Sequence, residues 1–147
     1  MSLFRAIGAV IIGIFVSYVL AQQLEGVLVR SLADPGQQLT FTQYFALRNT
    51  PGVLAARLVM SLFTGVLGGY MAAQLAREDA IRTVAIAAAA MTMMMIWDFT
   101  GGEFAWGTPI WMRVALVLVS GPAMMVGAMV RARAAEVGSE EPPKETP

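Results

Sequence analysis

The sequence predicts an all-α integral membrane protein: a four-helix bundle of two consecutive transmembrane hairpins, with short loops and a disordered C-terminal tail. Composition is the first reason, because 57% of the 147 residues are apolar and only 14% are charged, against about 25% charged residues in soluble domains. The second reason is that four segments are apolar over about 20 residues, the length that a helix needs to cross the hydrocarbon core.

The first helix is expected at about residues 4–29, and residues 6–24 contain no charged side chain. A second interpretation stays open, because Arg5, an apolar run and the small residue Ala21 also fit a secretory signal cleaved after Ala21. The run is long for such a signal. We therefore expect the segment to be retained as a spanning helix.

The connection at residues 31–50 is the longest, and Asp34-Pro35-Gly36 marks a turn in it. Its second half spaces Phe41, Tyr44 and Phe45 as one face of a helix. Either a short amphipathic helix in the headgroup region or an ordinary surface loop fits this pattern.

The remaining spans are expected at about residues 53–76, 81–99 and 109–132. Only four residues link the second span to the third, so these two helices should be antiparallel neighbours. Pro109 occupies the first turn of the last span, where proline is tolerated. The four spans make one domain, residues 1–133, and the Glu-, Pro- and Lys-rich residues 134–147 are expected to be a disordered polar tail.

Basic residues indicate the orientation. An even number of spans puts both termini on one side, which then holds six of the ten basic residues. This excess favours cytoplasmic termini, and we expect a bacterial inner membrane. The opposite side holds all three tryptophans, an aromatic belt at one interface: Trp97, Trp106 and Trp111.

Small residues recur at every fourth position on three of the helices, a pattern that lets helix backbones approach closely in lipid. We expect the stripes of the first two helices to face each other. The stripes are Ala9, Gly13, Ser17 and Ala21 on the first helix, Ser61, Gly65, Gly69 and Ala73 on the second, and Ala123 and Gly127 on the fourth.

Charged residues continue these stripes at one membrane face. Glu25 is the next step on the first stripe and Arg57 precedes the second, so we expect an ion pair between them. Asp98 and Arg113 should form a second pair in the other hairpin. The alternatives are that these side chains reach into water, or that they serve a solute or a proton.

The second and fourth helices also resemble each other at a constant offset, which favours a duplicated hairpin. Chance likeness between helices rich in alanine and glycine explains the matches equally well. The matching residues are Arg57, Gly65, Ala72 and Arg77 in one helix and Arg113, Gly121, Ala128 and Arg133 in the other.

The chain contains no cysteine and no histidine, and its formal net charge is zero. Zinc sites, His- or Cys-ligated haem, iron–sulfur clusters and Ser-His-Asp catalysis therefore have no ligands or base in this chain. We expect no cofactor, no resident metal and no nucleic-acid partner. Asp98 and Glu103 flank Gly101-Gly102 and could act as acid and base or hold a cation, but an interfacial turn explains their spacing better.

Met91 and Met95 lie on one face of the third helix. This Met-xxx-Met spacing resembles the intramembrane motif of eukaryotic copper transporters, and the resemblance implies Cu(I) binding by thioethers. Packing of flexible methionines in an apolar core is the alternative that we favour.

These observations predict a non-catalytic membrane protein, a structural or accessory subunit of a membrane complex. Its expected partners are the lipid bilayer and either a second copy of the chain or other membrane subunits. The alternative is a small ion or solute transporter or channel, with charged residues at its mouth on one membrane face: Glu25, Arg57, Asp98 and Arg113.

Overall fold

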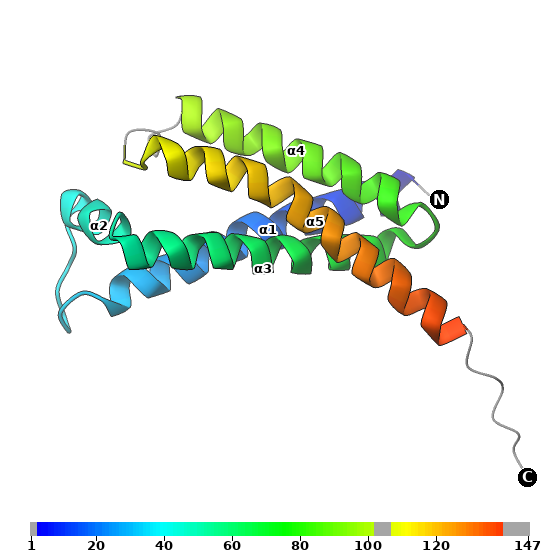
Figure 1. The fold of residues 1–147 in the computed structure, drawn as a ribbon, viewed down its shortest axis with the longest axis horizontal. Helices are drawn as coiled ribbons and strands as arrows, with labels where there is room; N and C mark the ends of the chain where they lie inside the picture. The colour runs from blue at the N-terminus through cyan, green and yellow to red at the C-terminus, as the bar shows by residue number, and fades with distance from the viewer. Residues whose placement is uncertain (1–2, 102–106, 140–147) are drawn as a thin grey trace, which may run out of the picture.

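The computed structural model of the chain describes residues 3–101 and 107–139, and this part of the chain is helical without strands (Figure 1). Four of its helices are long and apolar enough to cross a membrane. The expected membrane-spanning bundle is therefore confirmed. The elements are α1 (Leu3–Ser31), α2 (Phe41–Arg48), α3 (Pro51–Ala76), the 3-10 turn η1 (Arg77–Asp79), α4 (Ala80–Gly101) and α5 (Ile110–Ser139).

Helix α3 is the centre of the bundle. It packs along α1 on one side and crosses α5 on the other, and these are the two most extensive helix contacts in the described chain. Helix α4 packs mainly on α5 and touches α1 less extensively. The two predicted hairpins, α1 with α3 and α4 with α5, are thus packed pairs. Although α3 and α4 are joined by the tight η1 turn, each has a larger contact elsewhere.

The connection after α1 contains the expected turn, in which the Gln37 amide donates to the Asp34 carbonyl at 3.0 Å. Gly36 has a φ of 83°, a conformation that glycine adopts without steric cost. Of the two interpretations of the following segment, the helix is right. Thr40 and Gln43 form a capping box, each side chain bonding the other residue's backbone amide, and this fixes the start of α2.

Helix α5 continues to Ser139, beyond the predicted end at residue 132. Residues 134–139 are thus helical and not part of a disordered tail. The extension begins with residues 131–135, which are all alanine or arginine, and both are strong helix formers. Glu136, which follows them, is also a good helix former. Residues 140–147 of the predicted tail lie outside the described residues.

The glycine stripe of α3 faces α5, which corrects the predicted pairing of stripes. A methyl group placed on Gly65 would lie 2.7 Å from the Cβ atom of Ala123, and one on Gly69 would overlap the Met124 carbonyl. A methyl group on Gly127 would in turn overlap the Val66 carbonyl. Gly65-xxx-Gly69 and Ala123-xxx-Gly127 therefore form the close crossing of α3 and α5.

The stripe of α1 packs on a neighbouring face of α3. A methyl group on Gly13 would lie 3.0 Å from the Cβ atom of Ala72, and one on Gly68 would overlap the Ser17 hydroxyl. Ala9, Gly13 and Ser17 are buried in this contact, whereas Ala21 is partly exposed. Ser61 and Ala73 of the predicted α3 stripe are also buried.

Methionines fill much of the apolar core. Met91 and Met95 are buried in the same cluster as Met112, Met124 and aliphatic side chains of α3 and α4. Their position fits the packing role that thioethers serve in irregular cores.

Candidate functional site

Glu25 is the centre of a buried charge cluster at the end of the bundle where α1 ends and α3 begins. Its side chain is only 7% exposed. Arg57 Nε of α3 lies 2.6 Å from Oε2 of Glu25, and Arg48 Nε of α2 bonds the other oxygen, Oε1. The structure thus brings together Glu25 and Arg57 and adds a second arginine. One buried carboxylate is shared by two arginines, whose side chains are 2% exposed for Arg48 and 6% for Arg57.

Arg48 is the last residue of α2, and this short helix packs against α1 and α3 at the end of the bundle. Its Nη1 atom donates to the Thr108 hydroxyl at 3.0 Å, and its guanidinium carbon lies 5.1 Å from the centre of the Phe45 ring. The next residue, Asn49, donates to the Gly107 carbonyl at 2.6 Å. These contacts connect α1, α2 and the segment that leads into α5.

Arg57 is only partly satisfied by Glu25. Its Nη1 atom is buried and has no hydrogen-bond partner among the described residues. A buried donor without a partner destabilises a fold by about 1–3 kcal/mol, and more when the group is charged. The cluster therefore has hydrogen-bonding capacity that the described residues do not use.

A second polar contact lies beside the cluster. The Tyr18 hydroxyl of α1 donates to Oδ2 of Asp98 in α4 at 2.5 Å. A small cavity of about 40 Å³ joins the two contacts, and its lining includes Tyr18, Glu25, Arg57 and Asp98. Liquid water occupies about 30 Å³ per molecule. The cavity is therefore large enough for water but not for an organic solute.

Asp98 and Arg113 do not form the predicted ion pair. The ion pairs between described side chains both involve Glu25. Arg113 instead donates to the Thr108 carbonyl at 2.7 Å and to the Phe99 carbonyl at 3.4 Å. The carbonyls at a helix C-terminus carry partial negative charge, so the end of α4 attracts this cation. Asp98 faces α1 and not the start of α5.

The different contacts of Arg57 and Arg113 bear on the proposed duplication. One arginine binds a carboxylate inside the cluster, whereas its counterpart at the constant offset binds backbone carbonyls. The two hairpins therefore do not repeat the charge cluster. Glu103 and Trp106 lie outside the described residues, while Trp97 and Trp111 are exposed near this end of the bundle.

Tyr44 of α2 lies at the edge of the cluster. Burial raises the pKa of its phenol above the ordinary value of 10.0, and the negative charge of Glu25 raises the pKa further. The positive charges of Arg48, Arg57 and Arg30 act in the opposite direction but are weaker causes. Tyr44 therefore stays neutral over the physiological pH range.

Sequence reasoning missed Arg48, Tyr18 and Thr108 as members of this site. Two signals could have found Arg48. Thr40 and Gln43 have capping-box spacing, which predicts α2, and Arg48 lies three residues after Phe45 on the same helix face. Tyr18 carries no comparable signal, because a single tyrosine in an apolar span has many possible orientations.

No family model matches this chain, and comparison with the curated proteins and with the solved structures also gives no match. The function is therefore inferred from the residues and the geometry of the chain.

Proposed function

We propose that this chain is a non-catalytic membrane subunit, a helical scaffold that associates with other membrane proteins or with a second copy of itself. The observation that supports the proposal best is the buried charge cluster around Glu25. Both oxygens of Glu25 are bound by arginines from the same chain, and the adjoining cavity of about 40 Å³ excludes organic substrates. We infer that the cluster fixes the arrangement of the helices.

The lipid-facing surface supports an interaction role. Four large apolar side chains form one continuous exposed stripe on α1, at helical spacing: Phe4, Ile7, Ile11 and Phe15. Such a stripe fits acyl chains and equally fits an apolar helix of another subunit. We expect the side of the membrane that holds both termini to be the cytoplasmic side of a bacterial inner membrane.

Purification of the full chain in mild detergent tests this proposal. Native mass spectrometry should show either a discrete oligomer or a stoichiometric complex with another membrane protein. Replacing Ile11 and Phe15 together by alanine should weaken that association. Phe63→Ala, on the exposed surface of α3, is the matched control. A strictly monomeric particle without a co-purifying protein would count against the scaffold.

Transport of a proton or a small ion is the second candidate, and the cavity is the observation that favours it. Three of the four residues expected at a transport mouth line the cavity, namely Glu25, Arg57 and Asp98, whereas Arg113 does not. In this scheme the Tyr18–Asp98 contact would exchange protons with water in the cavity.

Flux measurements in liposomes separate the two candidates. Asp98→Asn removes the titratable group while keeping a hydrogen-bond acceptor for Tyr18. Under the transport scheme this variant should abolish a flux that the unmodified chain supports. Asp34→Asn, an exposed acid in the loop at the same end, is the control. A flux that is equal in both variants would eliminate the transport role of Asp98.

A further inference from the structure

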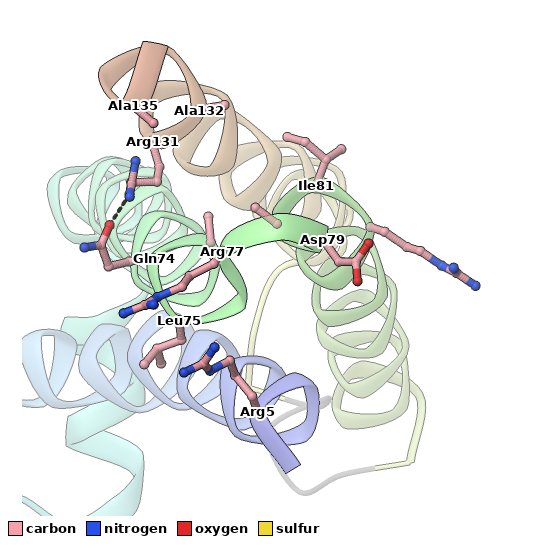
Figure 2. A pocket seen from close by; sticks show the side chains of 12 residues that line it. Arg5, Gln74, Leu75, Arg77, Asp79, Ile81, Arg131, Ala132 and Ala135 are labelled. Atoms are coloured by element: carbon pink, nitrogen blue, oxygen red, sulfur yellow. Dashed lines mark hydrogen bonds between the residues drawn. The ribbon is translucent and has the colours of Figure 1, made fainter. Parts of the chain in front are cut away.

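An arginine groove lies at the other end of the bundle, where α1 begins and α3 ends. We use this name for the open cavity of about 950 Å³ lined by Arg5, Arg77, Arg82 and Arg131. One described acidic side chain, Asp79, is also part of its lining. The volume is at the upper end of the range of known ligand sites, about 300–1,000 Å³. Figure 2 shows Arg5, Arg77 and Arg131 entering it from α1, η1 and α5.

None of these four arginines is ion-paired with Asp79, the described acid that shares the groove. The ion pairs between described side chains are those of Glu25, at the other end of the bundle. Arg131 bonds the neutral side chain of Gln74, a contact that orients it without cancelling its charge (Figure 2). The groove is therefore a cationic surface, and guanidinium groups bind phosphate oxygens in a bidentate manner.

The backbone at Arg77 supports a binding role. Its φ is 55° and its ψ is −101°, a conformation that residues with a side chain rarely adopt. A side chain in this region strains the backbone, and such strain is concentrated at functional sites. Arg77 occupies this unfavourable conformation, and its side chain lines the groove.

The walls of the groove distinguish a lipid from a free anion. They are apolar side chains at the ends of spanning helices, including the exposed Leu75 and Ile81 and the alanines Ala132 and Ala135. An inorganic anion would gain nothing from such walls. A phospholipid could place its phosphate among the arginines and its glycerol and upper acyl chains against the apolar wall.

We propose that the arginine groove binds the headgroup of an anionic phospholipid from the leaflet at this end of the bundle. Its four cations come from separate parts of the chain, and folding brings them to one depth. A basic residue near an anionic membrane surface contributes about 1 kcal/mol of attraction. Zwitterionic lipids lack the net charge that this attraction requires.

Native mass spectrometry of the detergent-solubilised full chain tests the proposal with three probes: phosphatidylglycerol, phosphatidylcholine and inorganic phosphate. We expect phosphatidylglycerol to bind most tightly. The double variant Arg5→Gln/Arg77→Gln should lose about fivefold in affinity for each arginine removed. Arg133→Gln is the matched control, because Arg133 is an exposed arginine of α5 that does not line the groove.

Two further variants separate a loss of lipid binding from a failure to fold. Arg5→Lys/Arg77→Lys retains the charge and should recover part of the affinity, and the Arg82→Gln variant gives the same readout if the double variant fails to fold. Equal binding of both lipids, or unchanged binding by the glutamine variants, would overturn the proposal. Displacement of the lipid by inorganic phosphate at equal concentration would show a free-anion site and would also overturn it.

Discussion

Arg48 of α2 binds Oε1 of Glu25 in α1 through its Nε atom, so a buried charge pair joins this short helix to the first long helix. Arg57 binds the other oxygen of the same carboxylate. Three helices therefore depend on one acidic side chain, and replacement of that side chain should affect all three.

Glu25→Gln should destabilise the protein by about 3–5 kcal/mol, because removal of one member of a buried ion pair leaves an uncompensated charge. Here two guanidinium groups would lose their partner. Thermal unfolding in detergent measures the effect. Asp34→Asn, a change of an exposed acid in the next loop, should leave the unfolding temperature unchanged. Equal stability of the two variants would show that the cluster does not hold the helices.

The reversed pair Glu25→Arg/Arg57→Glu should recover only part of the stability lost in Glu25→Arg alone. A simple pair would be restored by exchange of its charges. Arg48 also contacts Glu25, however, and would then face a second arginine. The unfolding temperatures of both single variants and of the double variant measure the recovery. Complete recovery would mean that Arg48 contributes little to the cluster.

Gly69→Ala should destabilise the chain by about 1–3 kcal/mol, the usual range for overpacking. The added methyl group would overlap the Met124 carbonyl, which is rigid backbone, so α3 and α5 would have to separate. Gly8→Ala is the control within a helix, because nothing lies within 4 Å of its added methyl group. Resistance to unfolding by a denaturing detergent should fall for the first variant only.

Tyr44 should make the protein less stable at high pH. Its pKa is raised above 10.0 in the folded state, so the folded protein favours the neutral phenol. The associated stability is fully present below pH 10.0 and is lost as the pH rises through the folded-state pKa. Ultraviolet absorbance of the phenolate, compared with that of Tyr44→Phe, isolates this titration. A Tyr44 that ionises below pH 10.0 would contradict the burial of its phenol.

The spans could be predicted from the sequence because lipid imposes a simple constraint: length and hydropathy suffice to find them. It is harder to predict from the sequence which face of a helix packs against which neighbour. On α3, Gly65 and Gly69 lie beside Gly68 and Ala72, so small residues cover two adjacent faces. One face meets α5 and the other meets α1. A small-residue stripe predicts close approach but does not identify the partner.

The pairing of charged side chains could also be predicted only in part. Position along a helix fixes the depth of a residue in the membrane, and depth was enough to associate Glu25 with Arg57. Asp98 and Arg113 also share a depth, yet Asp98 points toward Tyr18. The direction around the helix axis depends on the packing of all four spans. Pairwise reasoning about one hairpin cannot supply that direction.

The order of the cluster along the chain has a consequence for biosynthesis. Both partners of Glu25 follow it in sequence, so α1 emerges from the ribosome ahead of Arg48 and Arg57. The first span thus enters the bilayer with an acid that has no counter-charge, and charged residues oppose insertion. The charge of Glu25 is compensated only when α2 and α3 reach the membrane and bring Arg48 and Arg57 to it. Ribosome-bound chains in which Arg48 and Arg57 are still inside the exit tunnel should therefore hold α1 less firmly than chains in which both arginines have emerged.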